Sequence, residues 1–179
     1  MNLEKLFGSK TKVDILKYLI FRRQGISMRA LETELWWTFP AIKKQVDSLD
    51  DAGVVDIDKE NIWRSIHIKA WVEPILKELF FEALKQHLTT LFEGVWDTLK
   101  DYYRWNKFWK EIWMDLVLVY NGMEKWEIDK LKNDISECFR EYWIESASIV
   151  FMSADERDKR YRLADRFVLQ VMRFYNSKE

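Results

Sequence analysis

Residues 25–68 read GISMRALETELWWTFPAIKKQVDSLDDAGVVDIDKENIWRSIHI, and this stretch decides the fold of the first half of the chain. Ser27 is a good helix N-cap, and the apolar residues Met28, Leu31 and Leu35 fall on one face of the helix that follows. A second helix is capped by Thr38, with a proline in its first turn, where a missing N–H has no consequence. Its predicted buried stripe is Ile42, Val46 and Leu49.

The second helix is predicted to end at Ala52-Gly53, and the residues after it have the composition of a two-stranded hairpin. Val54-Val55 begin the first strand, residues 58–61 have turn chemistry, and residues 62–68 form a second β run without clean polar alternation. The stretch therefore predicts a helix-turn-helix followed by a wing. The outer face of the second helix has the outline of a recognition helix and carries Lys43, Lys44, Gln45 and Ser48.

Residues 38–55, TFPAIKKQVDSLDDAGVV, resemble the recognition helix and following strand of bacterial winged-helix regulators of the arsenic-repressor-like (ArsR) class. Residues 6–20, LFGSKTKVDILKYLI, are similar to the first helix of a group of these regulators that open with Phe-Gly-Ser-Lys-Thr. The resemblance implies that the recognition helix enters the major groove of double-stranded DNA. The side chains that would face the DNA are Thr38, Phe39, Lys43, Lys44 and Gln45. Lys59 and Arg64 of the wing would contact phosphates.

The charge distribution predicts modest DNA affinity. Residues 1–70 carry 12 Lys and Arg against 10 Asp and Glu, and the remainder carries 17 against 20. The wing holds Asp56, Asp58 and Glu60, which make it a poor phosphate cradle, so binding should weaken strongly with salt. The alternative is that Lys43-Lys44 is only the solvated face of a protein-binding winged helix, because a fold does not fix a function.

The composition favours a cytoplasmic soluble protein of one or two small domains. The chain has 179 residues, 48% of them hydrophobic, without an apolar run of about 18 residues or a signal peptide's apolar region. Its single cysteine, Cys138, permits no internal disulfide. His67 and His87 are isolated, so no metal site and no cofactor are expected.

Tryptophan is unusually frequent and glycine unusually rare. The chain has 10 Trp and 5 Gly, and the two together make about 8.4% of residues, close to an ordinary glycine content of about 7%. Trp36 lies where the helix-turn-helix needs positive φ, and Trp143 lies where a helix usually ends in glycine. We hypothesise that the tryptophans are UGA codons that the source organism reads as glycine. The alternative is a tryptophan-rich protein whose indoles pack a surface or bind bases.

The second half begins with a predicted linking helix over residues 72–85, with Pro74 in its first turn. Residues 87–93, HLTTLFE, fit either a strand or more helix, and periodicity does not separate the two. If position 96 is a glycine, the turn at residues 94–96 favours a strand that ends there. A short helix over residues 97–104 would follow.

The last part of the chain alternates strands and helices. Residues 114–120, MDLVLVY, predict a strand buried on both faces, and residues 149–151 predict another. The helix between them has one apolar face, made by Ile128, Leu131, Ile135, Phe139 and Tyr142, with Cys138 beside it. Ser153 and Glu156 form a capping box that opens a last helix. Its stripe is Ala164, Phe167, Val168, Val171 and Phe174.

The order of strand, helix, strand and helix in this last part of the chain implies an α/β layer with parallel strands. The predicted fold class is α+β, with a winged helix-turn-helix over residues 1–70, a linker helix over residues 71–86 and a small α/β domain over residues 87–179.

Residues 87–174 are similar to the nucleotidyltransferase-like domain that accompanies the Phe-Gly-Ser-Lys-Thr winged helices. The similarity rests on MDLVLVYNG at 114–122, on the spacing after it, and on YRLADRF at 161–167. Active members hold two metal ions with a Gly-Ser turn, an Asp-x-Asp pair and a third carboxylate on a later strand. Here Asp115 supplies one aspartate, whereas position 113, the residue after Gly94 and residues 149–151 supply no ligand. The resemblance implies a domain without catalysis that dimerises or senses a signal.

Three functions follow from these observations. The first is a homodimeric DNA-binding transcriptional regulator with no membrane partner, because recognition helices usually read two half-sites. The second is a nucleotidyltransferase-type enzyme with the winged helix as an appendage, which the missing first aspartate disfavours. The third is an interaction module, such as an antitoxin-like partner of another chain.

Overall fold

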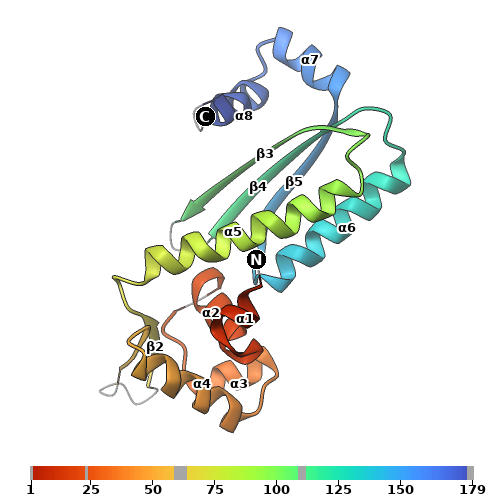
Figure 1. The fold of residues 1–179 in the computed structure, drawn as a ribbon. Coiled ribbons are helices and arrows are strands. Elements are labelled where there is room, and N and C mark those ends of the chain that lie inside the picture. The colour runs from red at the N-terminus through yellow and green to blue at the C-terminus, as the bar shows by residue number, and fades with distance from the viewer. Residues whose placement is uncertain (1, 23, 59–63, 109–111, 177–179) are drawn as a thin grey trace. The chain divides into compact units, whose positions relative to one another are not determined.

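The chain has an α+β fold. The structure is a computed structural model that describes residues 2–22, 24–58, 64–108 and 112–176 (Figure 1). Contacts within the chain divide it into two compact units, residues 1–86 and residues 87–179, called here the N-terminal unit and the C-terminal unit. Among the described residues, no helix combines the length and the apolar character needed to cross a lipid bilayer.

The N-terminal unit begins with helices and ends with a small sheet and the first part of a long helix, α5. Its elements are α1 (Leu3–Phe7), α2 (Lys10–Phe21), α3 (Met28–Leu35), α4 (Phe39–Asp51), β1 (Val55–Ile57), β2 (Ile66–Ile68) and α5 (Glu73–Glu93). The single helix expected over residues 6–20 is wrong at its start. Gly8 takes a left-handed φ of 71° and ends α1, and Ser9 then caps α2 by accepting a hydrogen bond from Lys12 N.

The small sheet pairs β1 with β2 antiparallel, with Val55 opposite Ile68 and Ile57 opposite Ile66. An isolated bridge joins Ile26 to Ile66, so the segment before α3 lies beside this sheet. The expected second strand covered residues 62–68, and β2 begins at Ile66. Residues 59–63, which include Lys59 and most of the expected turn, lie outside the described residues.

The core of the N-terminal unit forms where α2, α3 and α4 pack together. The predicted bounds of α3 are confirmed, as is the stripe of α4, because Ile42, Val46 and Leu49 are at most 2% exposed. The stripe repeats at three- and four-residue intervals, so it lies on one side of the helix. Burial of these side chains holds α4 in place and leaves its other side to solvent.

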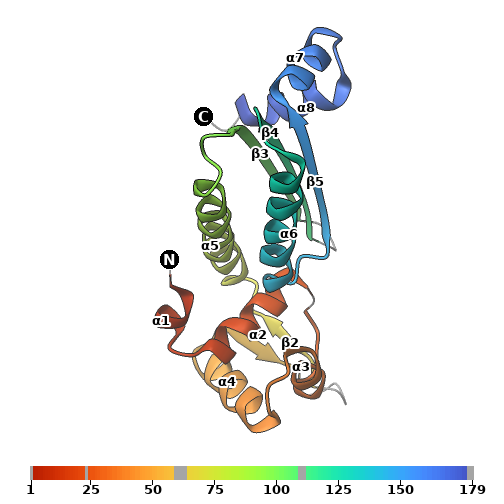
Figure 2. The same ribbon diagram turned by 90° about the vertical axis from the view of Figure 1, so that its right-hand side faces the viewer.

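The C-terminal unit is a three-stranded sheet with helices on both faces (Figures 1 and 2). Its strand order is β3-β4-β5; β3 and β4 are antiparallel, and β4 and β5 are parallel, as predicted for this pair. Helix α6 and the last turns of α5 cover one face of the sheet, and α8 covers the other face. The elements are β3 (Leu99–Phe108), β4 (Ile112–Tyr120), α6 (Lys125–Glu141), β5 (Ser146–Ser153), α7 (Ala154–Arg162) and α8 (Arg166–Asn176).

Residues 116–119 of the central strand β4 are buried on both faces of the sheet, as the apolar run predicts. Val117 and Val119 pack with Met152 of β5 and with Val168 and Val171 of α8. Because side chains alternate along a strand, Leu116 and Leu118 point to the opposite face, and both are fully buried. This strand therefore ties the two helical layers to one core.

For residues 87–93, which fit either a strand or more helix, the structure shows helix, and the expected helix over residues 97–104 is wrong. The linking helix does not end near residue 85 but continues to Glu93, because Phe80, Leu84, Leu88 and Phe92 form one buried stripe at four-residue spacing. Residues 97–104 instead lead into β3, whose pairing with β4 supplies the backbone hydrogen bonds that a short isolated helix would have to make alone.

The last predicted helix is two helices. The Ser153 side chain accepts a hydrogen bond from Glu156 N at 3.1 Å, which confirms the predicted start of α7. Ala164 was expected on the apolar stripe of one continuous helix, but its φ of 54° breaks the chain between α7 and α8. The Asp165 carboxylate then accepts hydrogen bonds from Phe167 N and Val168 N and opens α8.

Among the described residues, three helix ends share one backbone geometry. After α4, Gly53 N donates to Asp50 O and Val54 N donates to Leu49 O. Trp143 after α6 and Ala164 after α7 make the same pair of hydrogen bonds. Each donates its N–H to the carbonyl three residues earlier, and the residue after it donates to the carbonyl five residues before that donor. This is the Schellman ending, whose central residue has positive φ; here φ is 70° at Gly53, 58° at Trp143 and 54° at Ala164.

Candidate nucleic-acid interface

The turn between α3 and α4 is three residues long and is fixed from both sides. Trp36 ends α3 with φ 57°, the left-handed conformation predicted for this position, and its side chain is 92% exposed. Trp37 points back to α2, where its indole Nε1 donates to the Asp14 carboxylate at 3.1 Å. The turn sets the direction in which α4 leaves α3.

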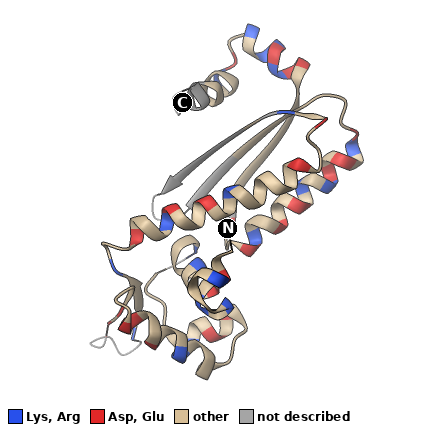
Figure 3. Cartoon of the chain, viewed as in Figure 1, with Lys and Arg blue, Asp and Glu red and all other residues tan. Residues whose placement is uncertain are grey.

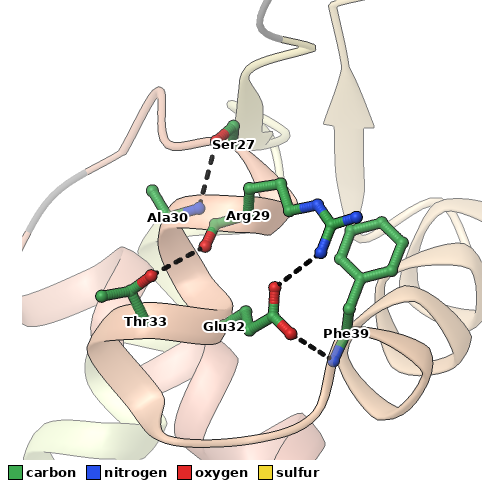
Figure 4. Close-up of polar contacts among 6 residues, drawn as sticks. All are labelled: Ser27, Arg29, Ala30, Glu32, Thr33 and Phe39. Atoms are coloured by element: carbon green, nitrogen blue, oxygen red, sulfur yellow. Dashed lines mark hydrogen bonds and ion pairs between the residues drawn. The ribbon is translucent and has the colours of Figure 1, made fainter.

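The N-terminus of α4 is capped by α3 and not by its own N-cap side chain. Thr38 occupies the N-cap position, but its side chain makes no capping hydrogen bond, contrary to the sequence-based expectation. Glu32 of α3 does this instead: its Oε1 accepts a hydrogen bond from Phe39 N at 3.0 Å (Figure 4). A carboxylate at this end of a helix is also favoured by the helix dipole.

Arg29 completes a cluster with Glu32 and Phe39. Its Nη1 contacts the second carboxylate oxygen of Glu32 at 3.0 Å, and its guanidinium carbon lies 4.0 Å from the centre of the Phe39 ring (Figure 4). Ser27 caps α3 through Ala30 N and so fixes the first turn that carries Arg29. The cluster joins the start of α3 to the start of α4 through two ionic groups and one ring.

The exposed side of α4 carries both signs of charge. Lys43 and Lys44 are exposed as predicted, and a shallow open hollow along this side is lined by Pro40, Lys43, Lys44, Asp47, Ser48 and Asp51. Lys43 forms an ion pair with Asp47 one turn later. Gln45 was placed on the same outer face, but it is half-buried, since about 100° of rotation per residue turns it towards the stripe of Leu49.

A lysine of α2 also reaches this side of α4. Lys12 Nζ donates to Ser48 Oγ at 3.0 Å, so Ser48 is half-buried and not simply part of an outer face. Lys12 and Arg29 are basic residues at this surface that sequence reasoning missed. The Phe-Gly-Ser-Lys-Thr stretch placed Lys12 on a helix, but only packing brings it to α4.

Of the two expected wing residues, Arg64 is among the described residues and Lys59 is not. Arg64 is exposed with φ 45°, and the neighbouring Ser65 carbonyl accepts a hydrogen bond from Asp58 N at 2.9 Å across the hairpin. Lys59 lies outside the described residues. Thr38, Phe39, Lys43 and Lys44 share the first two turns of α4 and its cap, whereas Arg64 stands on the separate segment before β2.

The charge pattern of the N-terminal unit is mixed and not uniformly basic. Figure 3 shows Lys and Arg together with Asp and Glu on its helices, and the sequence places both signs on each of α1 to α4. A patch of one sign would attract DNA from a distance, whereas this pattern limits such attraction to short range. Any nucleic-acid affinity of this unit therefore depends on the placement of a few basic side chains.

The acidic residues of the C-terminal unit do not form the metal-binding set of an active nucleotidyltransferase within the described part of the chain. Asp115 lies in β4, opposite Trp105 of β3 and Ser148 of β5 in the strand register. Residues 146–153 of β5 contain no acidic side chain. Within the described part of the chain, no group of three or more His, Cys, Asp or Glu side chains has an arrangement that could hold a metal ion.

The two histidines occupy different units. His67 lies in β2, as expected, and is exposed. His87 lies in α5, where its Nδ1 is 3.8 Å from a Glu141 carboxylate oxygen of α6.

Comparison of the chain with known protein families, with curated proteins and with solved structures finds no match.

Proposed function

We propose that this protein is a sequence-specific DNA-binding transcriptional regulator that acts as a homodimer through a winged helix formed by residues 1–70. In this proposal α4 is the recognition helix and β1 and β2 are the base of the wing. The supporting observation is the position of Lys43 and Lys44, exposed on a helix whose opposite stripe is buried and whose first turn is held by Glu32. Such a helix presents basic side chains in a fixed orientation, as binding in a major groove requires.

The resemblance to winged-helix regulators supports the same proposal. The order of α2, α3, a short turn, α4 and the hairpin of β1 and β2 agrees with that class, and Arg64 is exposed on the hairpin segment. Phe39 and Thr38 stand at the start of α4, where side chains of a recognition helix meet base edges. Lys43, Lys44 and Arg64 would contact phosphates, and Lys59 would extend this set.

The C-terminal unit is proposed to serve dimerisation or sensing, as a nucleotidyltransferase-like domain without catalysis. Of the carboxylates that metal-dependent nucleotidyl transfer requires, the sequence offers Asp115 and no partner at position 113 or on β5. Two magnesium ions need several carboxylates to hold them.

A protein-binding role is the second candidate, and one observation favours it. Asp47 and Asp51 line the same hollow as Lys43 and Lys44, and this mixture of charges fits a protein partner better than a polyanion. A DNA-binding regulator is expected to bind duplex DNA, whereas a protein-binding module is expected not to bind it at any salt concentration.

The test is selection of binding sites from a random duplex library by the full-length chain, followed by binding measurements across a salt series. A palindromic site with strong salt dependence is expected, because a dimer reads two half-sites and releases counterions from phosphates. The variant K43Q/K44Q should lower the salt slope by about 2, since each phosphate contact contributes about 0.9.

The matched control is K130Q/K132Q, which removes two exposed lysines from α6 of the C-terminal unit and should leave binding unchanged. If no duplex is enriched even at low salt, the regulator proposal is wrong and the chain should be tested against protein partners.

A further inference from the structure

A cluster of Arg29, Glu32 and Phe39 carries an inference that rests on the proposed function. Glu32 places a negative charge at the N-terminus of α4, beside the residues that would meet DNA. A carboxylate there would repel a phosphate backbone and weaken binding unless another group balanced it. The adjacent basic group is the Arg29 guanidinium, 3.0 Å from the same carboxylate.

We propose that Arg29 is a further DNA-contacting residue, held ready by Glu32 and Phe39 to bind a phosphate next to the start of α4. Three observations place it there. Its side chain is 74% exposed despite its two contacts. One nitrogen, Nη1, binds Glu32, and a guanidinium has five N–H donors, so donors remain for a phosphate. The Phe39 ring at 4.0 Å limits the directions that the guanidinium can take.

This arrangement assigns separate tasks to the three side chains. Glu32 accepts the Phe39 N–H and sets the first turn of α4, so it is a positioning residue. Phe39 supports the guanidinium plane. Arg29 neutralises Glu32 and provides the donors, because an arginine fork matches the geometry of phosphate oxygens.

The experiment measures the affinity and salt slope of the selected duplex for R29Q and E32Q. R29Q should weaken binding about tenfold at 0.1 M salt and reduce the salt slope by about 0.9, because one phosphate contact is lost. E32Q keeps an oxygen for the Phe39 N–H but removes the negative charge, so it should bind more tightly than the original chain.

The matched controls are K85Q and E82Q on α5, where Lys85 and Glu82 also form an exposed pair three residues apart. Neither control should change the slope. An R29Q variant that loses affinity with an unchanged slope would show that Arg29 only supports the fold, and an E32Q variant that binds no better would overturn the charge-balancing role. Failure of the original chain to bind any duplex would instead overturn the proposed function, and this inference with it.

A second inference comes from backbone geometry and does not depend on DNA binding. Trp36 and Trp143 have φ of 57° and 58°, beside Gly8, Gly25, Gly53 and Gly122, whose φ lies between 70° and 73°. A side chain with a Cβ is strained in this region, and for a bulky residue the conformation is an outlier. Four tryptophans in the described residues are also more than half exposed: Trp36, Trp71, Trp96 and Trp126.

We infer that positions 36 and 143 are glycine in the natural protein, through UGA codons read as glycine, and that the other eight tryptophans share this origin. An exposed indole gains nothing from burial, and a Schellman ending favours glycine. Removing the exposed side chain of Trp36 should therefore relieve strain alone, whereas Trp143 is half-buried, so removing its side chain should relieve strain and lose some packing.

The first readout is the mass of the natural protein, which ten glycines would lower by the difference between ten tryptophan and ten glycine residues; an unshifted mass would overturn the inference. The second readout is thermal unfolding of W36G and W143G, each expected to raise the midpoint, by about 2–4 °C for 1 kcal/mol in a chain of this length and by less for the half-buried Trp143. The matched control is W126G, an exposed tryptophan in the first turn of α6 with helical backbone, which should not raise it. A fall in midpoint for W36G and W143G would count against the inference.

Discussion

Gly53 and Trp143 occupy the same place in two copies of one helix ending. The residue after each donates its N–H to the carbonyl five positions earlier, at 2.9 Å after Gly53 and 3.0 Å after Trp143. Both residues have positive φ, 70° at Gly53 and 58° at Trp143. The same backbone hydrogen bonds therefore hold a left-handed residue at both sites, at little cost for a glycine and with strain for a residue that carries a Cβ.

The third copy of this ending, at Ala164, provides a test that involves no tryptophan. Replacement of Ala164 by glycine should stabilise the chain by about 1 kcal/mol, because φ of 54° strains a residue that has a Cβ. The converse variant, G53A, should destabilise by a similar amount, since a Cβ there meets nothing closer than Lys69 Nζ at 4.0 Å and only the backbone resists it. Chemical denaturation measures both, and equal stability of all three chains would contradict the backbone argument.

The buried phenol of Tyr142 makes stability depend on pH in the alkaline range. Burial raises the pKa of Tyr142 above its ordinary value of about 10, and the neighbouring Cys138 and Glu141 raise this pKa further. Below pH of about 10 both the folded and the unfolded chain keep the proton, so Tyr142 contributes no pH dependence. Above it the unfolded chain loses the proton first, and the free energy of unfolding falls by up to about 1.4 kcal/mol per pH unit.

Y142F is the control for this effect, because it keeps the ring and removes the titrating group. The free energy of unfolding should be measured for both chains from pH 8 to pH 11, a window of about one unit or more on each side of the ordinary tyrosine pKa. The original chain should lose stability relative to Y142F only in the upper part of that window. Parallel curves throughout would mean that the Tyr142 phenol ionises as easily in the folded chain as in the unfolded one.

Met152 tests whether α8 and the sheet share one core. It is 3% exposed in β5 and packs with Val117, Val119 and the two buried valines of α8. Its replacement by alanine should destabilise the C-terminal unit by about 2–5 kcal/mol, through lost burial and a remaining cavity. The measurement is denaturant unfolding, with M172A on α8 as a half-buried comparison that should lose less.

Cys138 reports on opening of the C-terminal unit alone. Its thiol is 2% exposed on α6, so a thiol-directed reagent should react at least about a hundredfold more slowly with the folded chain than with the unfolded chain. The rate should rise with denaturant as the C-terminal unit opens. If the folded chain reacted at the rate of a free thiol, the result would contradict the burial of the Cys138 side chain.

Much of the N-terminal unit could be predicted from sequence because its signals are local. Ser27 caps α3, the stripe of Ile42, Val46 and Leu49 repeats at helical spacing, and Gly53 ends α4; each acts within a few residues of its own position. Local signals failed where pairing partners lie far away. Residues 97–104 have no helical stripe or strand pattern of their own, and only the register with β4 makes residues 99–104 a strand.

The candidate site shows the same division. Lys43 and Lys44 follow from the helical pattern of α4, which leaves them opposite the buried stripe. Arg29 and Glu32 do not, because their roles arise from contacts with Phe39 across the turn, seven or more residues along the chain. Lys12 contacts Ser48, which lies 36 residues later in the sequence, and no local sequence pattern predicts that contact.

The positive φ of Trp36 and Trp143 has a consequence for how a gene is read. A left-handed backbone position distinguishes residues by whether they carry a Cβ, and it does so without reference to any codon. Where one residue type occupies such positions, as Trp36 and Trp143 do, helix endings therefore mark the codons at which the translation table should be checked.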